Sequence, residues 1–411
     1  MNIVCVGGGP AGLYFAILAK LRNGEHDVTV VERNPAGVTQ GWGVVFWDDL
    51  LDALYRNDPV SAREIQDAAA LWGGQEVHVR CEPTAYLGGY GYSVGRKRLL
   101  DILVGRAKGL GVDVQFEREV KDPSEFPAAD LIIACDGVNS SMRQLHSDHF
   151  QTEVDVGRNK YIWLGTHRVF DSFVFAFEET AVGWIWFHAY CFDAETSTVI
   201  AECSPETWAG LGFDELEPDQ SIKILEGIFE RHLNRHSLIN KKSGADQTPW
   251  LNFRRISNTN WYYDNIVLMG DAAHTTHFAI GSGTKLAIAD AIALAGTLDA
   301  HDDLRCALQA YQEDRRAALR NAQREALSST KWFEEVPRHI DQQPIQFAYS
   351  LWKRRGHSPP WRYQLHLATQ IAMLRRLRRS VGVAKRGLRA RRRGRLAEVQ
   401  QRFSAAGCAP E

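Results

Sequence analysis

The sequence contains no apolar run near the roughly 20 residues that a membrane-spanning helix needs. The chain has 411 residues, and its longest apolar stretches are typical of short strands or of one alanine-rich helix. Its first residues already have the pattern of a strand, without the basic segment that opens a signal peptide. We therefore expect a globular protein with no membrane partner.

Paired cysteines are also lacking. The seven cysteines lie at positions 5, 81, 135, 191, 203, 306 and 408, and they form no CxxC pair. An odd number of scattered cysteines argues against a disulfide framework and against a structural zinc site. We expect reduced thiols, a cytoplasmic location and no bound metal.

Acidic residues are missing from the segment between Arg375 and Arg395, which contains eleven lysines and arginines. The formal net charge of the whole chain is only −2, so the remaining residues are acidic as a group. This remainder shows no nucleic-acid-binding fold, and we expect no nucleic-acid partner. Two interpretations stay open for the basic segment: a solvated helix face, or attraction to phosphates of coenzyme A or of a carrier protein.

A dinucleotide fingerprint opens the chain. A strand from Met1 to Val6 leads into Gly7-Gly-Gly9-Pro-Ala-Gly12 and a helix, and a second strand ends at Glu32, 20 residues after Gly12. In this fingerprint the glycines allow a tight turn, close approach of a pyrophosphate and helix packing, and the acid binds ribose hydroxyls. The pattern predicts a Rossmann-like domain for FAD or NAD, with these binding residues: Gly7, Gly9, Ala11, Gly12, Glu32 and Arg33.

Two further strands end in Gly-Asp or Asp-Gly turns. Residues 130–135 form an apolar strand before Asp136-Gly137, and residues 266–269 form another before Gly270-Asp271. After the second turn, Gly281 to Thr284 begin the alanine-rich helix. Free N–H groups at a helix start favour anionic ligands.

The pattern between residues 156 and 263 is rich in strands. Phe173, Phe175 and Phe177 alternate with other residues, as do Trp184, Trp186, His188 and Tyr190. This alternation predicts an antiparallel sheet with one buried face. We expect an α/β fold: an FAD-binding domain from residues 1–75, 93–155 and 264–330, a β-sheet substrate domain from 76–92 and 156–263, and a helical, arginine-rich extension at 331–411.

Together, Gly7-x-Gly9-x-x-Gly12, Asp136-Gly137 and Gly270-Asp271 resemble the marker motifs of the single-component FAD-dependent aromatic hydroxylases, the p-hydroxybenzoate hydroxylase-like family. The resemblance covers about residues 1–330. The segments 41–46, 163–166, 188–190 and 270–285 look most like the branch with salicylyl-CoA 5-hydroxylase and 2-aminobenzoyl-CoA monooxygenase. A violacein-pathway indole hydroxylase is a more distant relative. The wider family usually has proline near Phe278-Ala279 and asparagine at Lys285, so the chain departs from it there.

The resemblance implies that NADH or NADPH reduces bound FAD, which reacts with O2 to a C4a-hydroperoxyflavin. That species would hydroxylate an electron-rich ring, of salicyl or 2-aminobenzoyl type, held as a CoA or carrier-protein thioester. No metal is needed, because the cofactor carries the reactive chemistry. Beyond the first fingerprint, the resemblance implies these FAD-binding residues: Arg96, Val120, Asp136, Gly270, Asp271, Gly281, Gly283 and Thr284.

Several residues are open to two interpretations. His188 and His277 are candidate bases that take a proton from the ring substituent, or else packed histidines; His274 is interpreted as structural. Candidates for the substrate pocket, or for plain core, are Phe46, Trp184, Trp186, Tyr190 and Phe278. The rival functions are hydroxylation of a free aromatic or indole compound, halogenation, and binding without catalysis. Halogenation is disfavoured because Trp184-Ile-Trp186 lacks a following Ile-Pro and no lysine lies between Lys20 and Lys97.

Overall fold

The computed structural model describes residues 1–39, 41–80, 82–240, 249–354, 367, 383 and 386–394. These residues divide into two compact units. Unit 1 contains Met1–Thr39, Arg96–Gly157 and Phe253–Thr330, and unit 2 contains Gln40–Gly95, Arg158–Asn252 and the described residues from Lys331 onward. Residues 41–75 cluster with the larger sheet of unit 2, and the described part of the extension belongs to that unit too.

Unit 1 is built on a mainly parallel sheet with the strand order β16-β17-β9-β1-β2-β8. Its strands are β1 (Asn2–Val6), β2 (Asp27–Val31), β8 (Asp113–Gln115), β9 (Leu131–Ala134), β16 (Tyr262–Tyr263) and β17 (Ile266–Leu268). β16 alone among them pairs antiparallel, with β17. β1, β9 and β17 are adjacent, so the three predicted motifs follow neighbouring strands at the carboxyl edge, where α/β sheets bind ligands.

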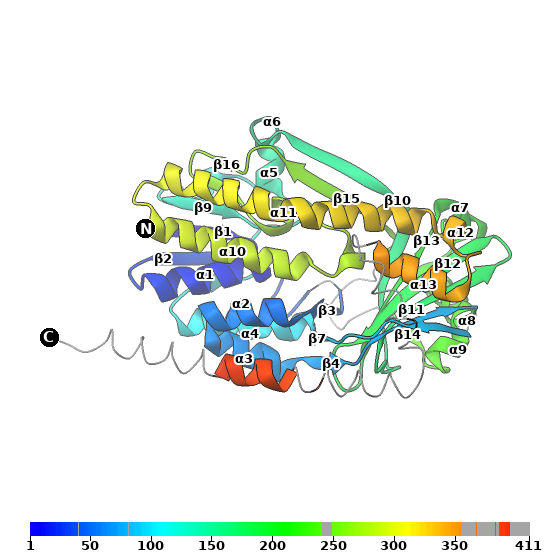
Figure 1. Cartoon of the computed structure of the whole chain (residues 1–411). Helices are drawn as coiled ribbons and strands as arrows, with labels where there is room; N and C mark the ends of the chain where they lie inside the picture. The colour runs from blue at the N-terminus through cyan, green and yellow to red at the C-terminus, as the bar shows by residue number, and fades with distance from the viewer. Residues whose placement is uncertain are drawn as a thin grey trace. The chain divides into compact units, whose positions relative to one another are not determined.

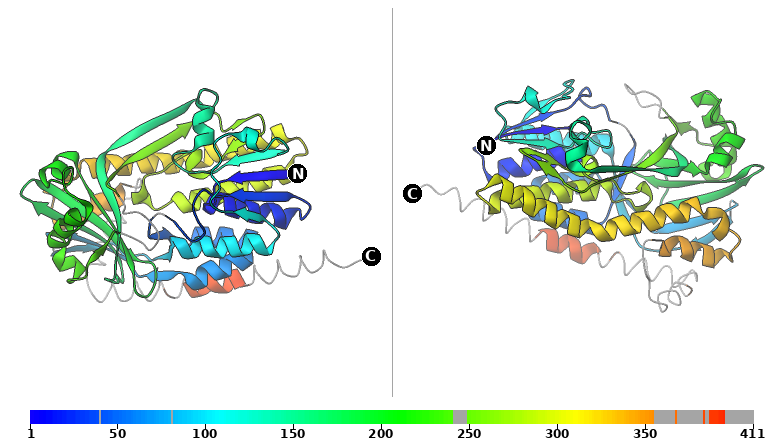
Figure 2. Two further views of the ribbon diagram at one scale, coloured as in Figure 1. Left: turned by 180° about the vertical axis from the view of Figure 1, so that it is seen from behind. Right: turned by 90° about the horizontal axis from the view of Figure 1, so that it is seen from above.

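Helices of unit 1 pack beside this sheet. α1 (Pro10–Arg22) begins with proline at its first position, which suits a helix start, and packs along α10 (Gly283–Ala300) (Figure 1). The other helical segments are α4 (Arg96–Gly109), η1 (Pro123–Glu125), α5 (Ser141–Leu145), α6 (Ser147–Phe150), η2 (Gly270–Ala272), η3 (Phe278–Ile280) and α11 (Leu304–Glu334), which continues into unit 2. Figure 2 shows α1 and the N-terminal strands from behind.

Unit 2 contains a larger sheet with the order β14-β10-β13-β12-β11-β5-β6, and β15 also pairs with β10. The strands of this sheet are β5 (Gln75–Val79), β6 (Glu82–Tyr86), β10 (Thr152–Thr166), β11 (Phe173–Thr180), β12 (Gly183–Cys191), β13 (Ser197–Cys203), β14 (Leu238–Ile239) and β15 (Leu251–Asn258). The pairs among β10 to β13 are antiparallel as predicted, whereas β11 and β5 are parallel. A small sheet, β3-β7-β4, consists of β3 (Gly43–Phe46), β4 (Ala70–Trp72) and β7 (Gly91–Gly95).

Both faces of the central strands in unit 2 are buried. Ile185, Phe187 and Ala189 of β12 face a core completed by Leu225 and Phe229. The opposite face carries the aromatic alternation and packs against residues of α11 and α13. The prediction of one buried face was therefore wrong, because helices distant in sequence cover the second face.

The helical segments of unit 2 come from widely separated parts of the chain. They are α2 (Asp48–Asn57), α3 (Pro59–Ala68), α7 (Pro205–Gly210), α8 (Pro218–Ile228), α9 (Glu230–Leu233), α12 (Val336–His339) and α13 (Pro344–Lys353). Asp58 separates α2 from α3, and its carboxylate accepts the N–H groups of Val60 and Ser61 as an N-cap. Asp58 therefore divides residues 48–68 into two helices.

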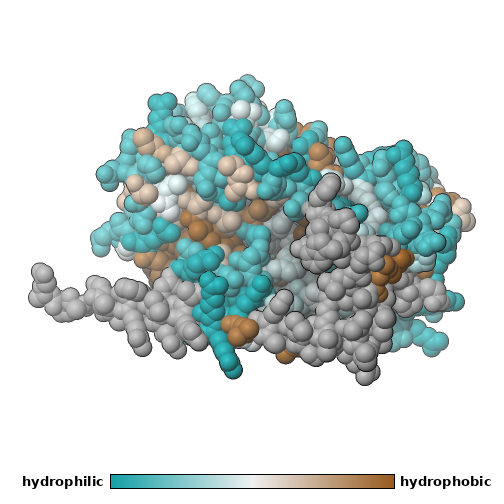
Figure 3. All heavy atoms as spheres, viewed as in Figure 1, coloured by the Kyte–Doolittle hydropathy of each residue, from teal (hydrophilic) through white to brown (hydrophobic). Residues whose placement is uncertain are grey.

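On the face in Figure 3, the described surface is mostly hydrophilic, with hydrophobic atoms in separate areas. Within the described ranges, no helix is long and apolar enough to cross a bilayer.

Candidate active site

The turn after β1 requires its glycines for different reasons. Gly7 has φ +122°, and a Cβ on it would overlap the carbonyl oxygen of Cys135. A Cβ on Gly12 would overlap the Gly7 carbonyl and lie 2.7 Å from Cys135 Sγ. At Gly9, by contrast, no described atom lies within 4 Å of an added Cβ, and no side chain caps the N-terminus of α1. The open Gly9 and the uncapped N–H groups fit a bound pyrophosphate.

Glu32 is fixed beside this turn. Its Oε2 accepts the Gly8 N–H (2.8 Å), and its Oε1 accepts the backbone N–H of Asn34 (2.9 Å) and the Asn34 side-chain amide (2.6 Å). Oε2 keeps a further lone pair, so the carboxylate can also accept a ribose hydroxyl. Nearby predicted residues differ in exposure: Arg33 is exposed, and Val120 is buried.

The second motif holds an acceptor without a partner. Asp136 Oδ2 accepts the Ser141 N–H (2.8 Å), whereas its buried Oδ1 has no hydrogen-bond partner among the described residues. Burial raises the pKa of Asp136, and hydrogen bonds from the following turn oppose that rise. Arg143 donates to the carbonyls of Val138 (2.6 Å) and Ala272 (3.1 Å), which ties this turn to the third motif. An orphaned carboxylate oxygen at this edge fits a ligand hydroxyl.

The third motif places Asp271 beside Arg96. Gly270 has φ +64°, which favours glycine, and its Cα faces Ala11 of α1 closely enough that an added Cβ would lie 3.1 Å from the Ala11 Cβ. Desolvation by the surrounding protein raises the pKa of Asp271, although the residue is partly open to solvent. The charge of Arg96 opposes this rise. Arg96 also donates Nε–H to Thr39 (3.1 Å). The two opposite charges provide donors and acceptors for a phosphate and a hydroxylated chain.

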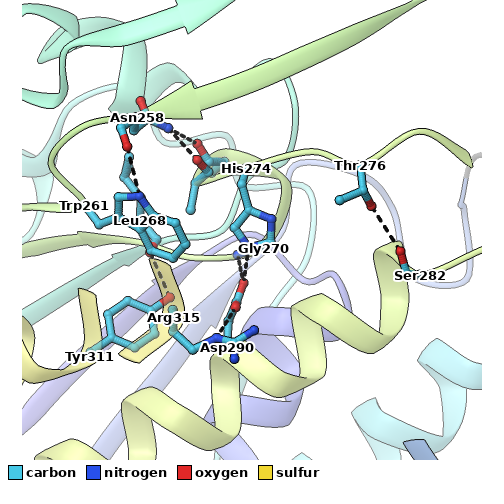
Figure 4. Close-up of polar contacts among 12 residues, drawn as sticks. Asn258, Trp261, Leu268, Gly270, His274, Thr276, Ser282, Asp290, Tyr311 and Arg315 are labelled. Carbon is cyan, nitrogen blue, oxygen red and sulfur yellow. Dashed lines mark hydrogen bonds and ion pairs between the residues drawn. The ribbon is translucent and has the colours of Figure 1, made fainter. Parts of the chain in front are cut away.

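A buried network supports this turn from behind (Figure 4). The fully buried Asp290 of α10 accepts the Gly270 N–H (3.0 Å), His274 Nε2–H (2.8 Å) and Arg315 Nε–H (2.7 Å). Burial alone would raise the pKa of Asp290, but His274 and Arg315 lower it below its usual value. The His274 ring also stacks on Trp261. These contacts support the structural interpretation of His274.

His277 has a structural contact as well. Its Nδ1 accepts the Ala279 N–H (3.3 Å), and its ring stacks on Phe278 with centroids 4.3 Å apart. In a neutral imidazole that accepts through Nδ1, the other nitrogen carries the hydrogen. The geometry therefore disfavours His277 as a base.

The start of α10 is open to an anionic group. Gly281 has φ +63°, and Ser282 precedes Gly283 and Thr284 without a side-chain cap on the helix N–H groups. The Ser282 hydroxyl instead lies 3.3 Å from the Thr276 hydroxyl across the loop. The uncapped N-terminus of α10 can stabilise negative charge.

In unit 2, the alternating aromatic residues form what we call the aromatic face: Phe173, Phe175, Phe177, Trp186, His188 and Tyr190. His188 is buried, with ring centroids 4.9 Å from Phe175 and 5.0 Å from Phe333. Tyr190 donates its hydroxyl hydrogen to the Gly43 carbonyl (2.9 Å), and burial raises its pKa, so it stays neutral.

Two further pocket candidates make ordinary packing contacts. Phe46 stacks on Tyr92 with centroids 5.6 Å apart, and the Arg80 guanidinium lies 4.8 Å from the Trp184 ring centroid. Phe278 belongs to unit 1, whereas the other predicted pocket residues belong to unit 2. The structure thus brings Trp186, His188 and Tyr190 onto one face.

Comparison with known proteins agrees with this geometry. Residues 1–326 match the family described as FAD binding domain. The chain belongs to the FAD-dependent aromatic hydroxylases. This confirms the predicted family and FAD as the cofactor of this hydroxylase.

Curated relatives of the hydroxylase cover most of its length. It is 38% identical to salicyloyl-CoA 5-hydroxylase from Streptomyces sp. over 361 residues, which are 85% of this chain and 69% of the relative. It is 33% identical to 3-hydroxy-4-methyl-anthranilyl-[aryl-carrier protein] 5-monooxygenase from Streptosporangium sibiricum, over 82% of this chain and 90% of the relative. It is 30% identical to protodeoxyviolaceinate monooxygenase from Chromobacterium violaceum, over 88% and 96%.

Solved structures confirm the fold class. A tetrameric form of 2-methyl-3-hydroxypyridine-5-carboxylic acid oxygenase matches with a TM-score of 0.69 at 19% identity, covering 86% of the hydroxylase and 95% of that chain. At this identity the match carries the fold alone.

Four residues of the hydroxylase were missed by the sequence reasoning: Asp290, Arg315, Glu202 and Arg354. Asp290 could have been found, because an acid inside an alanine-rich helix must be paired if buried. Glu202 gave a similar signal, as an acid within an apolar strand. Arg315 and Arg354 gave none, because a lone arginine on a charged helix is usually exposed.

Proposed function

We propose that this flavoprotein hydroxylates an electron-rich aromatic acyl group that is carried as a thioester of coenzyme A or of a carrier protein. The observation that carries the proposal is the similarity to two relatives whose names specify such thioesters, at 38% and 33% identity over more than four fifths of this chain. The ring types that fit are salicyl and 2-aminobenzoyl, whose hydroxyl or amino group makes the ring nucleophilic.

The FAD-binding roles belong to unit 1. When bound, FAD supplies reduction by NADH or NADPH, reaction with O2 and delivery of one oxygen atom to the ring. The glycine turn and the N-terminus of α1 would hold the pyrophosphate, and Glu32 would hold the adenosine ribose. Asp136, Asp271 and Arg96 would bind hydroxyl and phosphate groups. The open start of α10 would stabilise negative charge on the reduced cofactor.

The ring of the substrate would bind at the Tyr190 end of the aromatic face, because Phe333 and Phe347 cover the other end. Flat rings gain from contact with other aromatic side chains. His188 is the better candidate base of the two histidines, because His277 already uses Nδ1 as an acceptor. Transfer of the ring hydroxyl proton to the His188 imidazole would leave the electron pair on the phenolate oxygen and favour attack on an electrophilic oxygen, whereas an amino group already offers its lone pair.

The basic segment bears on the handle of the substrate. Most of residues 375–395 lie outside the described residues, but Arg386 to Gly394 form a helix. Arg389 and Arg393 pair with Asp48, whereas Arg391 and Arg392 are exposed. The exposed arginines remain candidates for the phosphates of the handle. A cytoplasmic location fits such substrates and stays a prediction.

The test follows NAD(P)H oxidation and product mass with the FAD-loaded protein. Salicylate and anthranilate are compared as free acids, as CoA esters and as carrier-bound thioesters, with protein free of FAD as the control. The proposal expects a gain of one oxygen on a thioester only. Equal rates with the free acids would contradict it, and turnover of an indole substrate would favour a function like that of the Chromobacterium relative.

A further inference from the structure

Glu202 of β13 is a carboxyl group within the aromatic face of unit 2. It is 1% exposed. Its Oε1 accepts a hydrogen bond from the Asn159 side-chain amide (2.8 Å), and its Oε2 accepts the Trp186 indole N–H (3.2 Å). A buried carboxyl group is costly, and perturbed carboxyl groups cluster at functional sites. Two neutral donors, the Asn159 amide and the Trp186 indole, hold this one.

The strand register explains why these side chains meet. Glu202 lies directly opposite Trp186 on β12 and opposite Tyr161 on β10. On β12, His188 lies two residues after Trp186, so the side chains of both residues lie on the same face of the sheet. Glu202 therefore lies in the same layer of side chains as the candidate base.

Trp186 connects Glu202 with α11, which packs on this face of the sheet. Its indole stacks on Phe333 of α11 with centroids 6.0 Å apart and an interplanar angle of 18°, and on Phe177 at 6.0 Å. Phe333 also contacts the His188 ring at 5.0 Å. Holding the indole edge thus fixes the ring that packs against His188.

We propose that Glu202 is a positioning residue for hydroxylation: its carboxylate holds Trp186, and through Trp186 and Phe333 it orients His188 toward the aromatic substrate. The inference rests on the proposed function in so far as the aromatic face receives the substrate ring. It adds that protonation of Glu202 loosens the indole and weakens substrate binding.

The surroundings of Glu202, above all its burial, place this protonation near neutral pH. Burial is the largest effect and raises the pKa of Glu202 to about 7, and Glu334 of α11 adds to the rise. The hydrogen bonds from Asn159 and Trp186 and the charge of Arg354, which follows α13, oppose it. Arg354 lies over Phe333 at 5.2 Å, so it borders the same cluster. His188, on the neighbouring strand β12, is a further titratable side chain on the same face of the sheet.

Ionised Glu202 attracts both N–H donors more strongly than the neutral acid does, since hydrogen bonds to a charged acceptor are roughly twice as strong. Substrate binding should therefore be tightest above pH 7 and weaken as Glu202 becomes protonated. Below the inflection, KM for the thioester should rise by up to about tenfold in total and then level off, with a smaller change in kcat, because the protonated acid keeps weaker hydrogen bonds.

The test measures KM and kcat of the holoenzyme across this range for wild type and Glu202→Gln. The matched control is Glu206→Gln, an exposed glutamate just beyond the same strand. We expect Glu202→Gln to abolish the inflection in KM while the bound FAD content stays unchanged, and Glu206→Gln to retain it. An inflection retained in Glu202→Gln would overturn the proposal.

A second variant tests the link to the indole and covers the case in which Glu202→Gln fails to fold. Trp186→Phe keeps an aromatic ring but removes a hydrogen bond that lowers the pKa of Glu202. The KM inflection should therefore move to higher pH. An unshifted inflection would refute the coupling.

Failure of the proposed function can be told apart by a measurement without substrate. The tryptophan fluorescence of wild-type holoenzyme should change near pH 7, and this change should be absent in Glu202→Gln and in Trp186→Phe. If no thioester is hydroxylated but this transition is present, the proposed function fails and the Glu202–Trp186 coupling stands. Absence of the transition in the wild type would overturn the coupling itself.

Discussion

Replacement of Asp290 by alanine tests whether the buried network holds the third motif in place. The change removes the acceptor for the Gly270 N–H, for His274 and for Arg315, which is only 7% exposed. Removing one partner of a buried ion pair costs about 3–5 kcal/mol, because the remaining charge is left without compensation. The loss should affect both the stability of unit 1 and its FAD affinity, since Gly270 leads directly into Asp271.

The assay is urea unfolding of the apoprotein, with FAD affinity measured by fluorescence titration. Asp299→Ala is the matched control, because Asp299 lies on the same helix but pairs with Arg22 at the surface. A surface pair contributes about 0–1 kcal/mol, so the control should unfold close to wild type. Asp290→Ala should lose about 3 kcal/mol or more and bind FAD at least tenfold more weakly. Equal unfolding midpoints for the two variants would refute the reasoning.

Three further predictions concern single positions. Gly12→Ala should lower FAD affinity at least tenfold in a fluorescence titration, because its Cβ would overlap the Gly7 carbonyl, whereas Gly24→Ala has open space and should be neutral. Arg393→Ala should cost about 1–3 kcal/mol in urea unfolding, since it removes the 2.6 Å partner of buried Asp48, which keeps its ion pair with Arg389. Glu202→Gln should remove a pH-dependent part of the stability: the folded-state pKa is raised from 4.5 to about 7, so the contribution of Glu202 is greatest below pH 4.5 and falls by about 3 kcal/mol as the pH rises to about 7. Urea midpoints that change equally with pH in wild type and Glu202→Gln would contradict the last of these.

The FAD-binding half was predictable because its signals are local. A strand, a glycine turn and a helix follow one another within a short stretch, and the steric need for Gly7 and Gly12 is set by neighbours that the fingerprint already specifies. The Asp136-Gly137 and Gly270-Asp271 turns are local signals too, because each directly follows an apolar strand. Local sequence therefore predicted both the fold class and the edge of the sheet where the motifs meet.

Unit 2 was less predictable because its contacts are distant in sequence. The alternation in β12 correctly assigned Trp186 and His188 to one face, but it could not show that Phe333 covers that face. Likewise, a helical period does not reveal that Asp290 pairs with Arg315 on the next helix. Burial on the second face of a sheet depends on which helix packs there, and only the tertiary structure shows that.

The arginine-rich segment illustrates how tertiary contacts change a prediction from charge alone. Asp48 lies in the first turn of α2, where the helix dipole favours an acid, and it binds Arg393, while Tyr90 donates its hydroxyl hydrogen to the same carboxylate. Removing the whole segment would break this ion pair and destabilise unit 2 whatever the substrate. Truncation is therefore a poor test of phosphate binding.

The exposed arginines provide a cleaner test of the handle. Arg391 and Arg392 belong to the same helix, are exposed and pair with no acid among residues that the structure describes. The double variant Arg391→Ala/Arg392→Ala should raise KM for a CoA thioester several-fold, most strongly at low salt, because screening weakens contacts between exposed charges. An N-acetylcysteamine thioester has the same acyl group and no phosphate, so its KM should not change. If both thioesters respond alike, the arginines affect the acyl site rather than the handle; if only a carrier-bound thioester responds, the segment recognises a protein surface.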